Sequence, residues 1–168
     1  MQGGFDGTNL FDRDETEINN SAVVADMNDS NRGLNNGPNV MAFAKAIDIM
    51  ANVVNTDLQL LAIPGIRAPE ITDNAAAACK TTRFDALYIM DIEQVDNLSA
   101  NITSDSQLPA VQLTTTQFKN RAIDNNFAAA YFPDVVMPDP NTLTNVVVPP
   151  SVAVLGALAL NDAVGHPW

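Results

Sequence analysis

The sequence predicts an α/β fold, with a parallel or mixed sheet flanked by helices and a β-hairpin before a buried C-terminal helix. Three observations lead to this expectation. Short apolar runs rich in strand-forming residues alternate with longer segments of helical periodicity. Two β-branched runs near residue 140 flank a Pro-Asn-Thr connection. An almost wholly apolar segment then follows two prolines and a serine.

Composition limits the classes of function. The 168 residues fit one α/β domain. The formal net charge is -12, with 8 Lys and Arg against 20 Asp and Glu, so nucleic-acid binding is not expected. Cys79 is the only cysteine, which excludes an internal disulfide and favours a role as a small apolar filler. The longest apolar segment is shorter than the roughly 20 residues that cross a bilayer, so no membrane insertion is expected.

Residues 1–39 are expected to form a mostly irregular polar segment within this domain. They are rich in Asn, Asp and Gly, which favour turns over regular structure. Gly3, Gly4 and Gly7 permit positive φ in a tight turn, and Asp6 can bond its own backbone there. A phosphate-binding loop is disfavoured because no Gly-Lys-Ser/Thr follows and no strand precedes.

Two acidic clusters, Asp12–Glu17 and Asp26–Asn31, offer oxygen atoms to a metal ion. A calcium loop of the helix-loop-helix type needs glycine at its sixth position, where these clusters carry Glu17 and Asn31. Solvated polar loops are therefore the favoured interpretation. One histidine and one cysteine cannot supply the usual zinc or iron ligands, so no metal and no cofactor is expected.

Helical periodicity first becomes clear near residue 40. Apolar residues recur at three- and four-residue steps from Val40 to Val54, which predicts an amphipathic helix. The apolar run Leu58–Ile63 ends at Pro64-Gly65 and predicts a buried strand. The alanine-rich Thr72–Lys80 predicts a helix, and Phe84–Ile92 predicts a second strand. Strand, helix and strand joined by short links predict a parallel crossover.

Ligands of such sheets bind beyond the carboxyl ends of the strands. The residues expected there are Pro64, Gly65, Arg67, Asp91 and Glu93. For Asp91 and Glu93 we expect solvation at the strand end rather than paired catalysis. No catalytic residue is therefore assigned.

The second half of the chain continues the alternation. Polar residues from Gln94 to Ser106 predict a surface loop. Thr114–Asn125 predicts a helix that begins in threonines, and Phe127–Phe132 predicts the next strand. The runs Asp134–Met137 and Asn145–Val148 predict a hairpin whose prolines suit its end or an edge.

The last segment predicts a core helix. Pro149 and Pro150 precede Ser151, whose hydroxyl can accept a hydrogen bond from the first helical turn. No polar side chain occurs from Val152 to Leu160, so a surface helix with a single apolar face is excluded. We therefore expect this helix to be covered by protein on every side.

Several of these stretches occur in an order that resembles a known family. They are Gly3 to Gly7, Leu58 to Gly65, Phe84 to Asp91, Val148-Pro149-Pro150-Ser151, the helix with Gly156, Asn161-Asp162, and Gly165-His166-Pro167-Trp168. The order is similar to that of the tail sheath proteins of contractile phage tails and related injection machines. That family has a Gly-Gly-x-Asp-Gly entry, strands ending in Pro-Gly and Asp, a Pro-Pro-Ser helix start and a Gly-x-x-Trp element.

The resemblance implies a segment of a sheath subunit, comprising a subtilisin-like α/β domain and lacking the assembly domain. It implies a structural protein, not an enzyme. Its partners would be other sheath subunits, in homo-oligomeric hexameric rings, and the tail tube protein. The subunit would assemble in the host cytoplasm and reside in the virion tail, where contraction drives the tube through the host envelope. Because the arms that link subunits are expected mostly outside this segment, the isolated chain is expected to be monomeric.

Two other functions stay open. An α/β hydrolase of subtilisin-like type would need a Ser-His-Asp site, for which Ser151, His166 and Asp162 are the candidates. His166 is the only histidine, and Asp162 precedes it by four residues at a helix end, which gives the imidazole no obvious support. An acidic, metal-dependent binding module built on Asp12–Glu17 is the other alternative.

Overall fold

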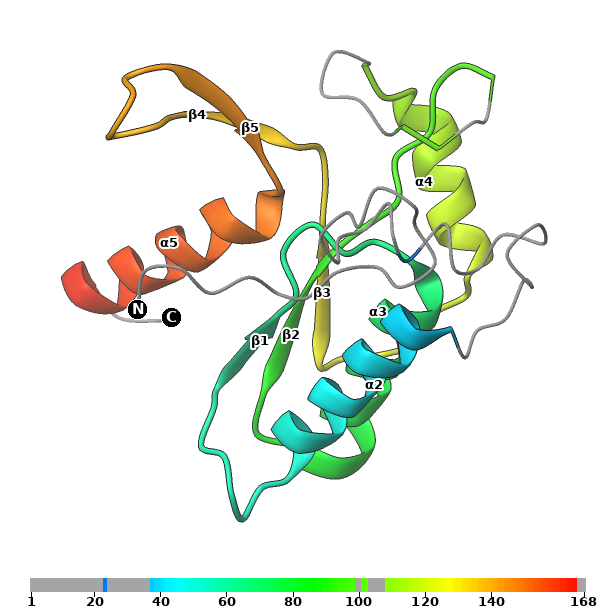
Figure 1. The fold of residues 1–168 in the computed structure, drawn as a ribbon, viewed down its shortest axis with the longest axis vertical. Coiled ribbons are helices and arrows are strands. Elements are labelled where there is room, and N and C mark those ends of the chain that lie inside the picture. Colours follow the sequence, from blue (N-terminus) through cyan, green and yellow to red (C-terminus); the bar gives the residue numbers. More distant parts are fainter. Residues whose placement is uncertain (1–22, 24–36, 99–100, 103–107, 166–168) are drawn as a thin grey trace.

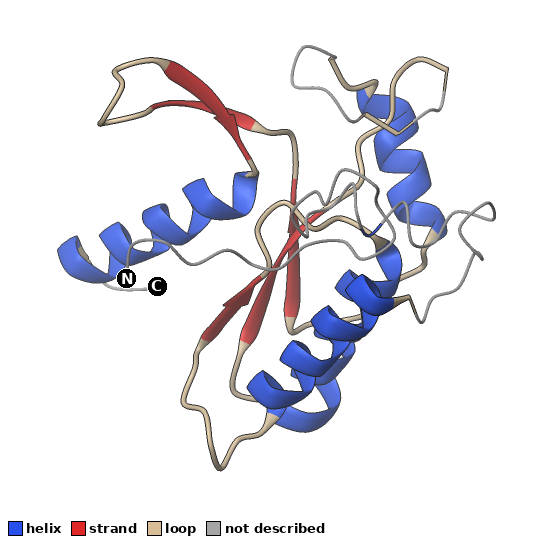
Figure 2. Cartoon of the chain, viewed as in Figure 1, coloured by secondary structure: helices blue, strands red, loops and turns tan. Residues whose placement is uncertain are grey.

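Residues 23, 37–98, 101–102 and 108–165 of the 168-residue chain are described by a computed structural model, and they confirm the α/β class. Three strands form a parallel sheet in the order β1-β2-β3, and two further strands form a separate antiparallel hairpin (Figure 1). In the view of Figure 2, most helices lie on one side of the sheet, and a single long helix lies on the other.

Several sequence-based predictions fall outside the described residues. These are the turn of Gly3, Gly4, Asp6 and Gly7, the clusters Asp12–Glu17 and Asp26–Asn31, and the terminal residues His166 and Trp168. The predicted irregular segment 1–39 is described only at Val23, which is buried in the core, and from Gly37 onward.

The helix α2 spans Pro38–Ala51 and so begins and ends earlier than predicted. Proline suits the first helical position because its fixed φ is close to the helical value. The amide hydrogen that it lacks would also have no partner within the helix there. After the helix, Asn52 Oδ1 accepts hydrogen bonds from the amides of Val54 and Asn55 at 3.0 and 3.3 Å. This side-chain turn stops the helix before the predicted end at Val54.

Strand β1, Leu60–Ala62, leads through helix α3, Pro69–Ala78, to strand β2, Leu87–Asp91. Helix α3 continues into a π-helical turn, Cys79–Arg83, which ends at Phe84 with a φ of 60°. Because a strand cannot pass through this left-handed conformation, β2 begins later than predicted. The burial of Cys79 confirms its role as a filler.

The remaining elements follow in the predicted order. Helix α4 is Val111–Asn120, strand β3 is Ala128–Tyr131, strand β4 is Val135–Pro138, strand β5 is Asn145–Val148 and helix α5 is Pro150–Val164. The hairpin is confirmed, and β5 matches its prediction residue for residue. Val135 pairs with Val148, and Pro138 pairs with Asn145 at the turn end of the hairpin.

Strand β2 is the centre of both the sheet and the core. It pairs in parallel with β1 and β3, and its residues from Tyr88 to Asp91 are all buried. Tyr88 and Met90 belong to the hydrophobic core together with residues of α2 and α3. Because side chains alternate between the faces of a strand, Asp91 faces the opposite way, toward the start of α5. The two faces of β2 therefore separate an apolar core from a polar attachment point.

Helix α5 forms as predicted, but the expectation that protein covers it on every side is wrong for the described part of the chain. Only Pro150 and Ser151 are buried in it, while Leu160 is 63% and Val164 is 75% exposed. Its first turn contacts β2, and the rest projects away from the sheet (Figure 1). The sequence shows that the helix is apolar but does not show what covers it. None of the described helices combines the length and apolar character that a membrane-crossing segment requires.

Candidate functional site

The Asp91 carboxylate, at the carboxyl end of β2, joins three segments of the chain. Its Oδ2 accepts hydrogen bonds from the Gly65 amide at 3.0 Å and from the Ser151 hydroxyl at 2.7 Å. Its Oδ1 accepts from the Ser151 amide at 2.9 Å. Asp91 is only 2% exposed, so the prediction that it is solvated at the strand end is wrong. The carboxylate tolerates burial because donors from two other segments satisfy its oxygens.

Asp91 also caps helix α5. Pro149 precedes the helix without a side-chain acceptor, and Pro150 at the first position has no amide hydrogen, so the first amide that needs a partner is that of Ser151. A carboxylate at this end also interacts favourably with the helix dipole. The prediction that Ser151 itself caps the helix is therefore wrong. Its hydroxyl donates to the same distant carboxylate that accepts from its amide.

Gly65 completes this junction from the loop after β1. Its φ is 80°, a conformation that glycine adopts at little cost. A Cβ at this position would lie 3.6 Å from Pro149 Cγ, which is an ordinary contact. The loop after β1 therefore packs against the start of α5 while its amide binds Asp91.

Many residues that carry the family resemblance meet here. The structure brings together Gly65, Asp91, Pro149, Pro150 and Ser151. Pro64 is exposed in the turn before Gly65. Asp162 is exposed near the end of α5, roughly three helical turns beyond Ser151, and does not join the cluster.

A second polar contact links the loops after β1 and β3. Arg67 Nη2 lies 2.7 Å from each carboxylate oxygen of Asp134, and Gln94 Nε2 donates to Asp134 Oδ1 at 2.8 Å. Charge-assisted hydrogen bonds thus join the loops that follow all three strands of the sheet. Gln94 is buried, so the predicted surface loop begins later than expected.

The geometry of Ser151 is that of a structural residue. Its hydroxyl is buried and donates to Asp91, whereas a catalytic serine donates to a base that a carboxylate orients. The candidate base, His166, lies outside the described residues. The contacts around Asp91 hold α5 and the loop after β1 to the sheet. We call the residues that take part the Asp91 junction: Gly65, Asp91, Pro149, Pro150 and Ser151.

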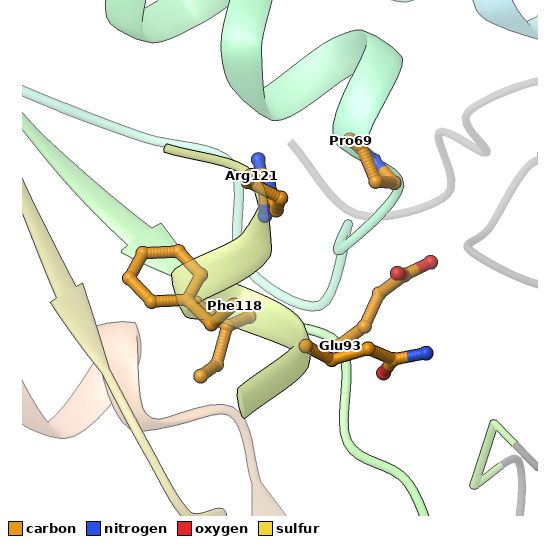
Figure 3. A pocket seen from close by; sticks show the side chains of 6 residues that line it. Pro69, Glu93, Phe118 and Arg121 are labelled. Atoms are coloured by element: carbon orange, nitrogen blue, oxygen red, sulfur yellow. The ribbon is translucent and has the colours of Figure 1, made fainter. Parts of the chain in front are cut away.

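Glu93 lies in a different environment from Asp91. Because β2 ends at Asp91, the chain turns, and Glu93 lines a pocket of about 110 Å³ between the start of α3 and the end of α4 (Figure 3). The other lining residues are Pro69, Ile92, Gln117, Phe118 and Arg121. The sequence correctly predicted that Glu93 lies beyond the carboxyl end of β2. It did not predict the pocket that Glu93 lines.

Burial raises the pKa of the Glu93 carboxyl, and the nearby Glu70 carboxylate raises it further, while the Arg121 guanidinium opposes both. Arg121 is also engaged elsewhere. Its Nη2 donates to Thr72 Oγ1 at 2.8 Å and pairs with the Asp73 carboxylate. Its positive charge is therefore shared among several carboxylates.

Within the described ranges, no group of three or more His, Cys, Asp and Glu side chains is arranged to hold a metal ion. The Asp12–Glu17 cluster lies outside those ranges. The candidate site is thus made of hydrogen-bonded carboxylates and one small pocket.

Sequence reasoning did not identify Asp134, Gln94 or Glu70 as site residues. The sequence does contain a signal for Asp134 and Gln94, namely their positions after strands of the sheet. The carboxyl ends of parallel strands meet at one edge of a sheet, so the first polar residues after each strand are candidates for mutual contact. Asp134 and Gln94 meet this condition, but Glu70 lies on a helix and is brought to the pocket only by tertiary packing.

Scans of protein-family models, curated proteins and solved structures each returned no match to this chain. The functional argument therefore rests on the residues, contacts and surfaces described above.

Proposed function

We propose that this chain is a structural segment of a contractile phage tail sheath subunit, which assembles around the tail tube and contracts to drive the tube through the host envelope. The proposal starts from the ordered motifs that resemble the sheath family. One structural observation supports it most directly. Helix α5 has no polar side chain from Val152 to Leu160, and it projects from the sheet with several of its large apolar side chains exposed (Figure 1).

Exposed apolar surface of this kind is typical of a protein that is covered in an assembly. The large exposed side chains on α5 are Val152, Leu160 and Val164. The hairpin adds Val136, which is 64% exposed, and Leu143, which is 84% exposed. These two elements form a continuous stretch of chain, and we call their exposed apolar side chains the α5-hairpin surface.

The hairpin offers a second means of assembly. In the described part of the chain, β4 pairs only with β5, so each strand has one edge with unpaired backbone groups. A two-stranded hairpin is marginally stable by itself, and an open edge accepts a further strand. Strand addition between subunits is the contact that the sheath resemblance implies.

The Asp91 junction supports a mechanical role. Contraction by rigid-body rearrangement requires each subunit to keep its fold while contacts between subunits change. Two hydrogen bonds from Ser151 to the buried Asp91 carboxylate hold the base of α5 to the central strand, and a third, from Gly65, holds the loop after β1. A load applied to α5 is thereby transmitted to the whole sheet.

Immunoelectron microscopy tests the proposal. Antibodies raised against this chain are expected to decorate the outer surface of contractile tails in particles from the source of the sequence. A sheath role would be contradicted if the antibodies bound only to another part of the particles, or if they bound to no particle at all.

A variant tests the α5-hairpin surface directly. Leu160→Asp is expected to abolish tube formation by a sheath subunit that contains this chain, because it places a charge in a contact that assembly dehydrates. Asp162→Asn is the matched control, two residues away on the same exposed helix. Normal tubes from Leu160→Asp would show that α5 does not lie in the interface.

A further inference from the structure

The pocket that Glu93 lines is a compact space where three segments of the chain meet. The segments are the start of α3, the end of α4 and the residues that follow β2 (Figure 3). The pocket volume is about 110 Å³, whereas pockets that enclose cofactors or drug-sized ligands are several times larger. An occupant must therefore be a group of only a few non-hydrogen atoms.

Arg121 brings an unsatisfied hydrogen-bond donor to this pocket. Its side chain is 14% exposed, and its Nε atom is buried with no acceptor in the described part of the chain. A buried N–H group without an acceptor is rare in folded proteins, because it loses its hydrogen bond to water and gains none in return. A ligand atom that accepts a hydrogen bond from Nε would remove this cost.

The rest of the Arg121 guanidinium is held in place. Its Nη2 donates to Thr72 Oγ1 at 2.8 Å and pairs with the Asp73 carboxylate. Its Cζ lies over the Phe118 ring, 5.4 Å from the ring centroid, in a cation–π contact. Because these contacts fix the guanidinium before a ligand arrives, binding at Nε costs little side-chain entropy.

The charges on the lining do not favour an ion. Among the six lining residues, Glu93 supplies the one carboxylate and Arg121 the one guanidinium. The charge of Arg121 is already shared with Asp73. An anion in the pocket would be repelled by Glu93, and a cation would be repelled by Arg121. A neutral ligand avoids both repulsions.

A carboxamide group matches the polar atoms of the lining. It carries a carbonyl acceptor and N–H donors in one plane. Its carbonyl can accept a hydrogen bond from Arg121 Nε. Its N–H donors can bond to oxygen atoms of the Glu93 carboxyl group or the Gln117 amide, which both line the pocket. The apolar side chains of Pro69 and Ile92 suit the carbon atoms that carry the group.

We propose that this pocket binds a neutral carboxamide group, whose carbonyl oxygen accepts a hydrogen bond from Arg121 Nε. The group is either the end of an asparagine or glutamine side chain from another protein or a free small amide. This proposal does not depend on the sheath function.

The test is an NMR titration of the full chain with propionamide. The Arg121 Nε–H group gives its own signal in a proton–nitrogen correlation spectrum, and the Arg121→Lys variant assigns that signal by its absence. We expect the signal to shift saturably in the wild type, with a dissociation constant of about 10–100 mM for a ligand of this size. The amide signal of Phe118 should shift with the same dissociation constant.

Two variants separate the Nε contact from charge. Arg121→Lys keeps a positive charge beside Asp73 but lacks Nε, so the Phe118 amide should no longer shift saturably. Lys119→Arg is the matched control, because Lys119 is exposed on the same helix and does not line the pocket. Propionamide should bind to this control as tightly as to the wild type.

Two ligands of the same shape test the chemistry in the wild-type chain, where no substitution can disturb folding. Butanone has the carbonyl but no N–H donor, and propionate has acceptors and a negative charge. Propionamide should bind about threefold more tightly than either, because one hydrogen bond or one repulsion separates them. Its affinity should not change with ionic strength, because it is neutral.

Four results would overturn the proposal: an unchanged Arg121 Nε–H signal, equal affinity for the three ligands, tighter binding of propionate, or no saturation, which would leave the pocket to water. The source of the amide is a separate comparison. Tighter binding of N-acetylglutamine amide than of propionamide would identify a protein side chain as the ligand, and the reverse order would identify a free amide.

Discussion

At the residue scale, Asp91 is a buried polar side chain that joins the loop after β1 and the start of α5 to the central strand. It is buried and accepts three hydrogen bonds, two from backbone amides and one from a hydroxyl. Removing a buried acceptor leaves its donors unsatisfied, which costs more than the loss of the bonds alone. Ser151 provides two of the three donors, but only its hydroxyl depends on the identity of its side chain.

Asp91→Ala is therefore expected to lower the free energy of unfolding by about 2–4 kcal/mol. Ser151→Ala should cost only about 1–2 kcal/mol, because the amides of Gly65 and Ser151 still reach the carboxylate. Urea denaturation followed by circular dichroism measures both. Asp162→Asn, on the exposed part of α5, should stay within about 0.5 kcal/mol of the wild type. A larger loss for Ser151→Ala than for Asp91→Ala would contradict the capping role of Asp91.

Glu93 gives a prediction about pH. Because burial raises its pKa in the folded chain, the folded state holds this proton more tightly than the unfolded state. Its contribution to stability is therefore present at acidic pH and is lost as pH rises above the ordinary glutamate pKa of about 4.3. Glu93→Gln stays neutral, so its stability relative to the wild type should increase from pH 4 toward neutrality. Urea midpoints at several pH values measure this difference, and a difference that is independent of pH would exclude the effect.

At the element scale, α5 and the hairpin differ from the rest of the chain. Helix α3 packs against β2, and α2 packs against α3, whereas α5 buries only its first residues. Its attachment to the sheet depends on the Asp91 junction, and its own stability depends on helix propensity. Substitutions at two glycines, Gly156 in α5 and Gly65 in the Asp91 junction, test these two contributions separately.

Gly156→Ala should raise the free energy of unfolding by about 0.5–1 kcal/mol, because glycine is unfavourable inside a helix. A Cβ there would meet no atom within 4 Å. Gly65→Ala should instead lower it by about 1 kcal/mol or more, because alanine is strained at a φ of 80°. Thermal and urea unfolding of the two variants provide the comparison. If Gly156→Ala had no effect, α5 would not unfold together with the sheet.

At the scale of the whole molecule, charge and apolar surface are unevenly distributed. The chain has a net charge of -12, yet Asp139 is the only charged residue from Val135 to Leu160. The α5-hairpin surface is therefore apolar and nearly uncharged, while the rest of the chain repels other copies. We expect this repulsion to keep isolated copies apart, and the nearly uncharged surface is the part of the chain that the proposed sheath assembly would cover.

The isolated chain is expected to be monomeric at neutral pH and low salt, because the net charge opposes association there. Analytical ultracentrifugation should show one species at the monomer mass. Leu160→Asp should sediment in the same way, since Leu160 is already exposed. Rings or helical tubes seen by negative-stain microscopy would contradict this expectation.

Local patterns allowed most elements to be predicted. The β5 strand is correct to the residue because three consecutive valines and a proline turn determine it over a few positions. The boundaries of α2 and β2 are wrong because Asn52 and the left-handed Phe84 stop regular structure through conformations that periodicity does not reveal. The α/β class is robust to such errors, since it depends only on the order and type of the elements.

The sequence by itself determined the order of strands and helices, the hairpin, and the apolar character of α5, because these follow from side-chain periodicity and backbone preference within short windows. Only the tertiary structure decided that Asp91 caps α5, that Glu93 lines a pocket with Arg121, and that α5 is exposed. Asp91 and Ser151 are 60 residues apart. Contacts at such separations, and the presence or absence of cover over a helix, depend on how the elements pack, which no local pattern specifies.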